Sequence, residues 1–312
     1  MSLEQSHPVH LEPSELGTKE YWDEYYQNDL ENGAVHSDDE GDADVEGDGD
    51  EKTGSQQQPP DPSELDSWFD DVGAPAKTLA FLTSTTFPLS PNYVSLSGHT
   101  RQAPSVLDLG TGNGGALFAL RLHGHYTGRM VGVDYSSKSV ELARTLCAQY
   151  ASSASSATDS GSSVDNIAFE VFDIIHDSPH GQPWWDASLG PGGFDLVLDK
   201  GTFDAISLSS ATVADPASSN RHQRRICELY PAKVLQMVKP GGYLLVTSCN
   251  WTEAEVVAWF TTRPPGGSEN EVFEVYDAIK YPVFEFGGQK GQGVASVCFR
   301  KPQRTETDQG RM

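Results

Sequence analysis

The sequence predicts an α/β fold in which a seven-stranded, mostly parallel sheet carries helices on both faces. Short apolar runs of strand length alternate with helix-like segments between residues 105 and 300, a pattern typical of strands buried between helices. A glycine-rich turn at residues 110–115 follows the first run. Carboxylates close four consecutive runs, at Asp108, Asp134, Asp173 and Asp199. Together these features describe a single α/β domain with a ligand site at the strand ends.

The first half of the sheet follows directly from apolar periodicity. Strands are expected at 105–109, 130–134 and 167–172. Segments of helical periodicity, at 114–123 and 136–150, follow the first two strands. Because helices separate the strands, we expect these strands to run parallel. The tract of serine, alanine and glycine after the second helix is expected to be a surface loop.

The second half of the sheet contains two further parallel strands and a terminal pair. The parallel strands are expected at 194–198 and at 242–247, after a turn formed by residues 239–241. The terminal pair is expected at 272–277 and 294–300. Seven strands result, and the last is expected to run antiparallel.

Two helices are expected ahead of the sheet, at 16–32 and 76–82, and the first is amphipathic and rich in aromatic residues. An acidic run at 38–51 repels itself and buries nothing, so we expect disorder there. This run is either a solvated linker or an attractor of a basic partner. The predicted organisation is an aromatic segment packing on the domain (1–33), an acidic, Gln/Pro-rich linker (34–63), the α/β domain (64–303) and a flexible tail (304–312).

Composition excludes several classes of function. The net charge of −24, from 21 basic against 45 acidic residues, argues against direct binding of nucleic acid. No membrane association is expected, since no run approaches the roughly 18 apolar residues of a span and the N-terminus lacks an apolar signal core. Four cysteines without a C-x-x-C pair indicate a soluble, cytoplasmic protein with reduced thiols, expected to be monomeric. The paired histidines lack a third ligand, so no metal is expected.

The glycine turn matches two nucleotide-binding patterns. Gly110, Gly112 and Gly115 satisfy the dinucleotide fingerprint GxGxxG. Asp108, Gly110, Gly112 and Gly114 satisfy the D-x-G-x-G-x-G pattern of S-adenosylmethionine-dependent methyltransferases. A carboxylate at the first position would repel a pyrophosphate, whereas the amino group and sulfonium of S-adenosylmethionine tolerate it. Asp108 therefore favours the methyl donor.

The strand-end carboxylates extend this site. Asp134 is placed to accept the two ribose hydroxyls. Asp173 is placed to accept the adenine amino group, with Phe172 or Ile174 packing on the ring. Either acid alone could simply cap the next helix, but their joint placement favours cofactor binding. The residues expected to hold the cofactor are Asp108, Gly110, Thr111, Gly112, Asn113, Gly114, Asp134, Tyr135, Phe172, Asp173, Ile174 and Asp199.

The segment after the fourth strand bears on the methyl acceptor. It lacks the Asn-Pro-Pro-Tyr type of motif that clamps a planar amide or base, and a lysine amine needs no such clamp. Lys200 in this segment is expected to form a structural ion pair. A nicotinamide dehydrogenase would need a further base, but the one Tyr-x-x-x-Lys, Tyr276 with Lys280, falls on a predicted strand.

Several segments of the chain together carry a family resemblance. They are 16–23 (LGTKEYWD), 68–69 (WF), 199–208 (DKGTFDAISL), 247–252 (TSCNWT) and 286–288 (FGG) with Gly291. In these segments the chain resembles the eukaryotic lysine methyltransferases that act on translation elongation factor 1-alpha, and the resemblance covers about residues 16–32 and 66–301. It implies a Rossmann-like, class I seven-β-strand methyltransferase fold, S-adenosylmethionine as cofactor and elongation factor 1-alpha as protein partner. Segments 34–63, 151–163 and the loop around Trp184 look like insertions.

Methyl transfer to lysine is an in-line displacement by the neutral amine, so no strong base is required. Asp199 is expected to orient the ammonium and help release its proton, and Trp251 to line the site at the end of the fifth strand. Trp22 and Trp68 either join that wall around the lysine stem or only pack on the core. The expected catalytic residues are Asp199 and Trp251, and the expected substrate contacts are Trp22, Trp68, Thr202, Phe203, Asn250 and Trp251.

Two alternatives stay open at this point. One is a small-molecule methyltransferase of the same fold, which would close a lid over its substrate, whereas a protein substrate needs an open, rimmed cleft. The segment around Trp22 could be such a lid. The other alternative is a binding module that has lost catalysis, which the intact Asp108, Asp134 and Asp173 argue against.

Overall fold

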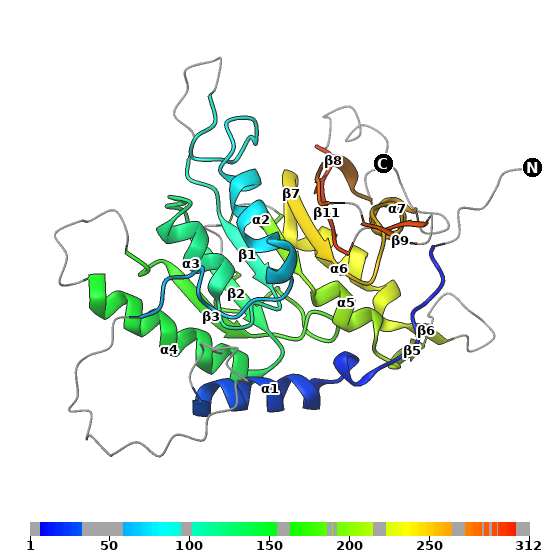
Figure 1. Cartoon of the computed structure of the whole chain (residues 1–312), viewed down its shortest axis with the longest axis horizontal. Helices are drawn as coiled ribbons and strands as arrows, with labels where there is room; N and C mark the ends of the chain where they lie inside the picture. The colour runs from blue at the N-terminus through cyan, green and yellow to red at the C-terminus, as the bar shows by residue number, and fades with distance from the viewer. Residues whose placement is uncertain are drawn as a thin grey trace, which may run out of the picture.

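The central sheet has seven strands in the order β3-β2-β1-β4-β7-β11-β8 (Figure 1). The first five of these are parallel, and β11 runs antiparallel to both of its neighbours. The predicted α/β fold with an antiparallel last strand is therefore confirmed. The strands are β1 (Val106–Leu109), β2 (Met130–Asp134), β3 (Ile167–Val171), β4 (Phe194–Lys200), β7 (Val238–Ser248), β8 (Glu274–Ile279) and β11 (Ala295–Arg300).

A computed structural model describes most of the chain, apart from its ends and several internal segments. The acidic run and most of the predicted linker lie outside the described residues, as does the predicted tail from residue 304. The described residues are 7–32, 59–94, 102–154, 163–185, 189, 192–214, 223–263, 272–282, 284–286, 289–291 and 293–303.

Helices cover both faces of the sheet and enclose one apolar core on each. On one face α5, α6 and α7 pack over residues such as Val197 and Val246. On the other face α2, α3 and α4 pack over residues such as Leu196 and Met130. The inner strands β1, β2, β4 and β7 therefore bury side chains on both sides, which explains their mostly apolar sequences, whereas the edge strand β8 is largely exposed. The helices are α1 (Lys19–Asn32), α2 (Ala74–Leu82), α3 (Gly115–Leu122), α4 (Ser137–Ala154), α5 (Thr202–Ser207), α6 (Tyr230–Met237) and α7 (Glu253–Thr261), with short 3₁₀ turns η1 (Glu15–Gly17), η2 (Asp70–Val72) and η4 (Ile226–Glu228).

The N-terminal segment docks on the domain and positions α1 beside α4 (Figure 1). A Cβ at Gly17 would stand 2.3 Å from the backbone carbon of Leu208, so only glycine allows this close approach. The Ser14 N–H donates to the Leu208 carbonyl over 3.1 Å. From α1, Asp23 accepts the Ser136 hydroxyl over 2.6 Å. Contacts that join residues more than 100 positions apart thus bring α1 to the strand ends.

Two boundaries differ from the sequence prediction. Helix α4 continues to Ala154, because Ser152 and Ser153 donate their hydroxyls to carbonyls one turn earlier and so tolerate the helix. Strand β7 begins at Val238 and takes in the predicted turn at 239–241. The left-handed backbone of Gly241 (φ 79°) lies within this strand, whose register against β4 shifts there.

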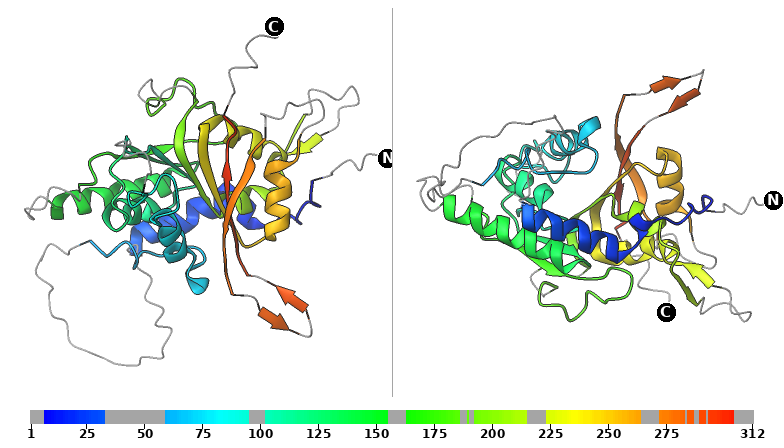
Figure 2. Two further views of the ribbon diagram at one scale, coloured as in Figure 1. Left: turned by 90° about the horizontal axis from the view of Figure 1, so that it is seen from above. Right: turned by 60° about the horizontal axis from the view of Figure 1, so that its bottom comes forward.

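Two small hairpins were not predicted. One pairs β5 (Thr212–Ala214) with β6 (Gln223–Arg225). The other pairs β9 (Phe284–Phe286) with β10 (Gln289–Gly291) and extends away from the body of the sheet (Figure 2). Both are too short to carry a clear alternating pattern in the sequence. Among the described residues, no helix is long and apolar enough to cross a membrane.

Candidate active site

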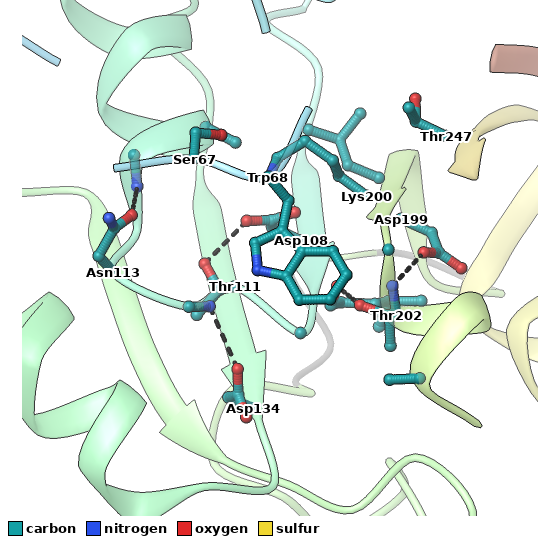
Figure 3. Close-up of a pocket in the computed structure, with 18 of the residues that line it drawn as sticks. Ser67, Trp68, Asp108, Thr111, Asn113, Asp134, Asp199, Lys200, Thr202 and Thr247 are labelled. Carbon is teal, nitrogen blue, oxygen red and sulfur yellow. Dashed lines mark hydrogen bonds between the residues drawn. The ribbon is translucent and has the colours of Figure 1, made fainter. Parts of the chain in front are cut away.

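A cavity of about 780 Å³ lies at the carboxyl ends of β1, β2 and β4. Its floor is the loop at 110–115, and its charged lining includes Asp108, Asp134, Asp199 and Lys200. Figure 3 shows side chains from these strand ends facing the same space as Trp68. The volume is typical of a site for a cofactor-sized molecule.

The backbone of the glycine loop packs so closely against neighbouring residues that a side chain at Gly110 or Gly112 would clash. Gly110 and Gly112 adopt φ values of 62° and 57°, in the left-handed region that favours glycine. A Cβ would stand 2.1 Å from the Thr202 hydroxyl at Gly110 and 2.7 Å from the Tyr26 hydroxyl at Gly112. The Thr111 hydroxyl donates to Asp108 over 2.8 Å and ties the loop to the end of β1. The predicted loop is therefore preformed around an open space.

Asp134 is fixed at the end of β2 by two backbone donors. Its Oδ2 accepts the Gly112 N–H over 3.1 Å, and its Oδ1 accepts the Ser136 N–H over 2.9 Å. The carboxyl is 6% exposed, and burial raises its pKa. Each carboxylate oxygen keeps a second lone pair, so Asp134 can still accept two ribose hydroxyls. The residues present thus fit the adenosine part of S-adenosylmethionine.

The residues predicted to hold adenine lie together at one side of the cavity. Phe172 and Ile174 are buried and line the cavity. Asp173 accepts the N–H groups of Ile175 and His176 over 2.8 and 3.1 Å, and its second oxygen lies 2.8 Å from His176 Nδ1. The carboxylate of Asp173 therefore shapes this turn, and contact with the adenine amino group stays a proposal.

Aromatic residues from α1 and the segment before α2 cover the cavity. Trp22 and Trp68 both line it and pack together at 5.0 Å between ring centroids, so each packs on its neighbours and faces the site. The Trp22 indole donates to the Leu16 carbonyl over 2.9 Å. Tyr25 donates to the Asp66 carboxylate over 2.6 Å, and the Asn113 amide donates to the Asp66 carbonyl over 2.8 Å. These bonds join the cover to the glycine loop.

Residues from the predicted linker also take part in this cover. The Pro60 carbonyl accepts the Tyr150 hydroxyl over 2.6 Å, and Asp61 lies 3.2 Å from His123 Nε2. Pro62 and Ser63 line the cavity. Tyr135 joins from the other side, where its hydroxyl donates to a carbonyl of the N-terminal segment. Residues 59–63 therefore contact the domain and help form its site.

Asp199 is engaged by the protein itself. Its Oδ1 accepts the N–H groups of Thr202 and Phe203 over 3.0 and 3.2 Å, and its Oδ2 accepts the Tyr230 hydroxyl over 2.7 Å. The side chain is 1% exposed, and burial raises its pKa to about 7. The first N–H groups of α5 have no partner within the helix, so Asp199 supplies one. These bonds give Asp199 a structural role at the edge of the cavity, and its contact with the substrate ammonium stays a prediction.

Trp251 and Phe203 lie in the core, which corrects the expectation that they contact substrate. Trp251 is 4% exposed, donates to the Ser207 hydroxyl over 3.2 Å and stacks on Phe203 at 6.2 Å. Neither residue lines the cavity, and neither does Asn250. The physical reason is the tight turn between Ser248 and Thr252, which directs the indole back under α7. Thr202 does line the cavity and donates to the Leu109 carbonyl over 2.6 Å.

Several residues of the site were missed by the sequence reasoning. Tyr26, Asp66 and Asp70 line the cavity from segments remote from the strands. Asp204 does not line the cavity but supports it from behind: it accepts the Cys249 N–H over 2.9 Å and the Ser248 hydroxyl, which ties α5 to the end of β7. The signal for Asp204 was its place within the DKGTFDA segment; the others carried no local signal.

One group of possible metal ligands occurs among the described residues. Ligand atoms of His7, His10 and Glu228 lie within 4.8 Å of one another, but none of the three residues lines the cavity. The Glu228 carboxylate already accepts from the Arg224 guanidinium and the Arg225 N–H over 3.1 and 2.9 Å. This group therefore has no connection to the site.

The fold and the loop define a class of protein. A parallel sheet with Asp108 before the Gly110–Gly112 turn and with Asp134 after the second strand is that of a class I S-adenosylmethionine-dependent methyltransferase. A family model described as a methyltransferase domain matches residues 101–288.

The chain belongs to the EFM4 family of protein-lysine N-methyltransferases. It is 34% identical to Protein-lysine N-methyltransferase EFM4 of Saccharomyces cerevisiae, over 93% of this chain and 96% of that protein. It is 32% identical to efm4 of Schizosaccharomyces pombe, over 93% and 95% of the two chains. It is 28% identical to EEF1A lysine methyltransferase 2 of Homo sapiens, over 93% and 88%. The family confirms the predicted class of enzyme and its cofactor, S-adenosylmethionine.

Proposed function

We propose that this methyltransferase modifies a lysine of translation elongation factor 1-alpha, as a monomer in the cytoplasm. The observation that carries the proposal is similarity over 93% of the chain to relatives of which several are named for this substrate. Four free cysteines agree with a reducing compartment. The methyl group comes from S-adenosylmethionine when it is bound.

The chain has to favour the neutral form of the substrate lysine. A free lysine with a pKa of about 10.4 pays roughly 4.6 kcal/mol to lose its proton at about pH 7. Trp22 and Trp68 supply an apolar wall that removes water from the ammonium, and desolvation lowers its pKa. Asp66 and Asp70 line the same cavity and attract the ammonium form as it enters. Because nearby carboxylates favour the charged amine, its deprotonation depends on the apolar wall, and the proton leaves to solvent water. These residues therefore bind, orient and desolvate the lysine, and none has to act as a strong base.

The test is methyl transfer from labelled S-adenosylmethionine to purified elongation factor 1-alpha. We expect one modified lysine by peptide mass spectrometry. Asp134→Ala should remove donor binding, because the variant loses the acceptor for the ribose hydroxyls, and should remove transfer with it. The exposed Asp71→Ala, whose residue lies outside the cavity lining, is the matched control.

The experiment distinguishes a wrong substrate from a wrong enzyme class. Normal donor binding with no methylated lysine on elongation factor 1-alpha would reject this substrate and keep the enzyme class. Because α1 and the segment before α2 cover the cavity, a small-molecule acceptor is the second candidate. That candidate predicts transfer to small molecules of a protein-free cell extract, which we do not expect.

A further inference from the structure

Lys200 is a half-buried cation in the active-site cavity for which the mechanism above has no use. It is the last residue of β4 and lines the cavity. Within the part of the chain that the structure describes, no carboxylate oxygen lies within 4.0 Å of the Lys200 ammonium nitrogen, the distance that defines an ion pair. The expected structural ion pair is therefore absent. Burial lowers the pKa of Lys200, while Asp108 and Asp70 act in the opposite direction.

The other basic groups that line the cavity already have partners. Lys19 lies 2.6 Å from Asp23, His123 lies 3.2 Å from Asp61, and His176 lies 2.8 Å from Asp173. Of the basic side chains that line the cavity within the described residues, only Lys200 has no carboxylate within ion-pair distance. Asp108, Asp70, Asp66 and Asp199 lie near enough to act on Lys200 electrostatically, but none forms an ion pair with it. Its ammonium is therefore free to bind an anion that arrives with a ligand.

The strand order indicates which part of the cofactor reaches Lys200. Along the edge, Phe172 follows β3, Asp134 ends β2, Asp108 lies in β1 and Lys200 ends β4, in spatial order. Adenine, ribose and the methionyl group follow one another in the cofactor. With adenine at β3 and ribose at Asp134, the methionyl group falls over β1 and β4.

Lys200 and Asp108 also share one side of the sheet. Asp108 pairs in register with Leu198, and Leu198 and Lys200 are two residues apart on one strand, so their side chains point the same way. Asp199 points to the other side, where it meets Tyr230. The methionyl group carries one ammonium and one carboxylate, and this side of the sheet offers one acid and one base.

We propose that Lys200 binds the carboxylate of the methionyl group of S-adenosylmethionine, while Asp108 faces its ammonium. Lys200 is then a cofactor-binding residue that recognises the amino-acid end of the donor. This inference depends on the cofactor and is independent of which protein is methylated.

The test compares two donors by isothermal titration calorimetry in the absence of acceptor. S-adenosylmethionine and its decarboxylated form differ only in the carboxylate. Wild-type protein should bind S-adenosylmethionine about 10- to 100-fold more tightly, the range of a charge-assisted hydrogen bond. In Lys200→Met this preference should disappear through loss of affinity for S-adenosylmethionine alone. Lys200→Arg should keep part of it, because the charge remains.

The exposed Lys138→Met on α4 is the matched control and should keep the wild-type preference. Thermal unfolding without ligand shows whether each variant is folded. The proposal is overturned if folded Lys200→Met retains the preference, or if wild-type protein binds both donors equally. Unchanged donor affinity with a shifted pH profile of transfer would instead assign Lys200 to the acceptor amine and would equally reject the proposal.

Discussion

At the scale of single residues, buried carboxyls, Asp108 and Asp199 among them, shape how the stability of the protein responds to pH. Burial raises the pKa of Asp108 to about 6 and that of Asp199 to about 7, from 3.8. At pH values between 3.8 and these raised pKa values, the folded protein keeps the two carboxyls protonated, whereas the unfolded chain has released their protons. The free energy of unfolding therefore falls as pH rises from about 4 to about 7.

Asp199→Asn should weaken this pH dependence. The amide keeps an oxygen for the N–H groups of Thr202 and Phe203 but removes the ionisable group. Between about pH 5 and about pH 7 we expect the slope of the unfolding free energy to become less negative by up to about 1.4 kcal/mol per pH unit. Urea unfolding at several pH values measures this slope, with Asp71→Asn as the exposed control.

Two substitutions of Asp199 distinguish a structural role of this residue from a catalytic one. Asp199→Ala leaves the start of α5 and the Tyr230 hydroxyl without an acceptor, which should cost about 1–3 kcal/mol. Asp199→Asn should retain lysine methylation in the assay described above. If a folded Asp199→Asn protein binds the donor normally but transfers no methyl group, Asp199 acts in catalysis, as expected from the sequence.

At the scale of elements, the cover of the cavity depends on how the N-terminal segment docks. Helix α1 places Trp22 and Tyr26 over the glycine loop, and the contact of Gly17 with Leu208 fixes its start. None of these contacts is local in sequence. The site is therefore closed by an element that folds onto the sheet from outside.

Gly17→Ala tests this docking. The added methyl group would meet the Leu208 backbone at 2.3 Å, and backbone cannot give way as a flexible side chain would. We expect a loss of about 1–3 kcal/mol in unfolding free energy and weaker binding of S-adenosylmethionine. Gly293→Ala is the control, since the nearest atom to its Cβ is 4.0 Å away. Equal donor affinity in the two variants would show that α1 is not needed to hold the donor.

At the scale of the whole molecule, the charge is unevenly distributed. The segment 38–51 carries nine of the 45 acidic residues. It lies outside the described residues, whereas Pro60 contacts α4, and Pro62 and Ser63 line the cavity. Removing the whole predicted linker at 34–63 would therefore also remove part of the site.

Replacing residues 34–58 by a Gly/Ser linker of equal length should leave the site intact. We expect unchanged donor affinity and unchanged turnover on a short lysine peptide, because such a linker is flexible and contributes no packing. Calorimetry and a peptide methylation assay measure the two quantities. A large loss of peptide turnover would show that the acidic segment belongs to the active enzyme.

The sequence by itself determined the sheet, the glycine loop and the strand-end acids. Buried strands have a continuous apolar pattern, and a backbone cradle needs glycine at fixed spacing, so both are local properties of the chain. The predicted Asp108, Gly110, Gly112 and Asp134 accordingly line one cavity. The DKGTFDA segment, which begins at Asp199, identified the family through its residues.

Only the tertiary structure decided which side chains face that cavity. Trp251 turns into the core, while Trp68 and the distant Tyr26 face the site. Asp199 lines the cavity but is held by the first N–H groups of α5. The reason is that the direction of a side chain beyond a strand end depends on the turn and on the elements packed against it. For Lys200, the structure replaced an expected ion pair with an unpaired cation beside the donor site.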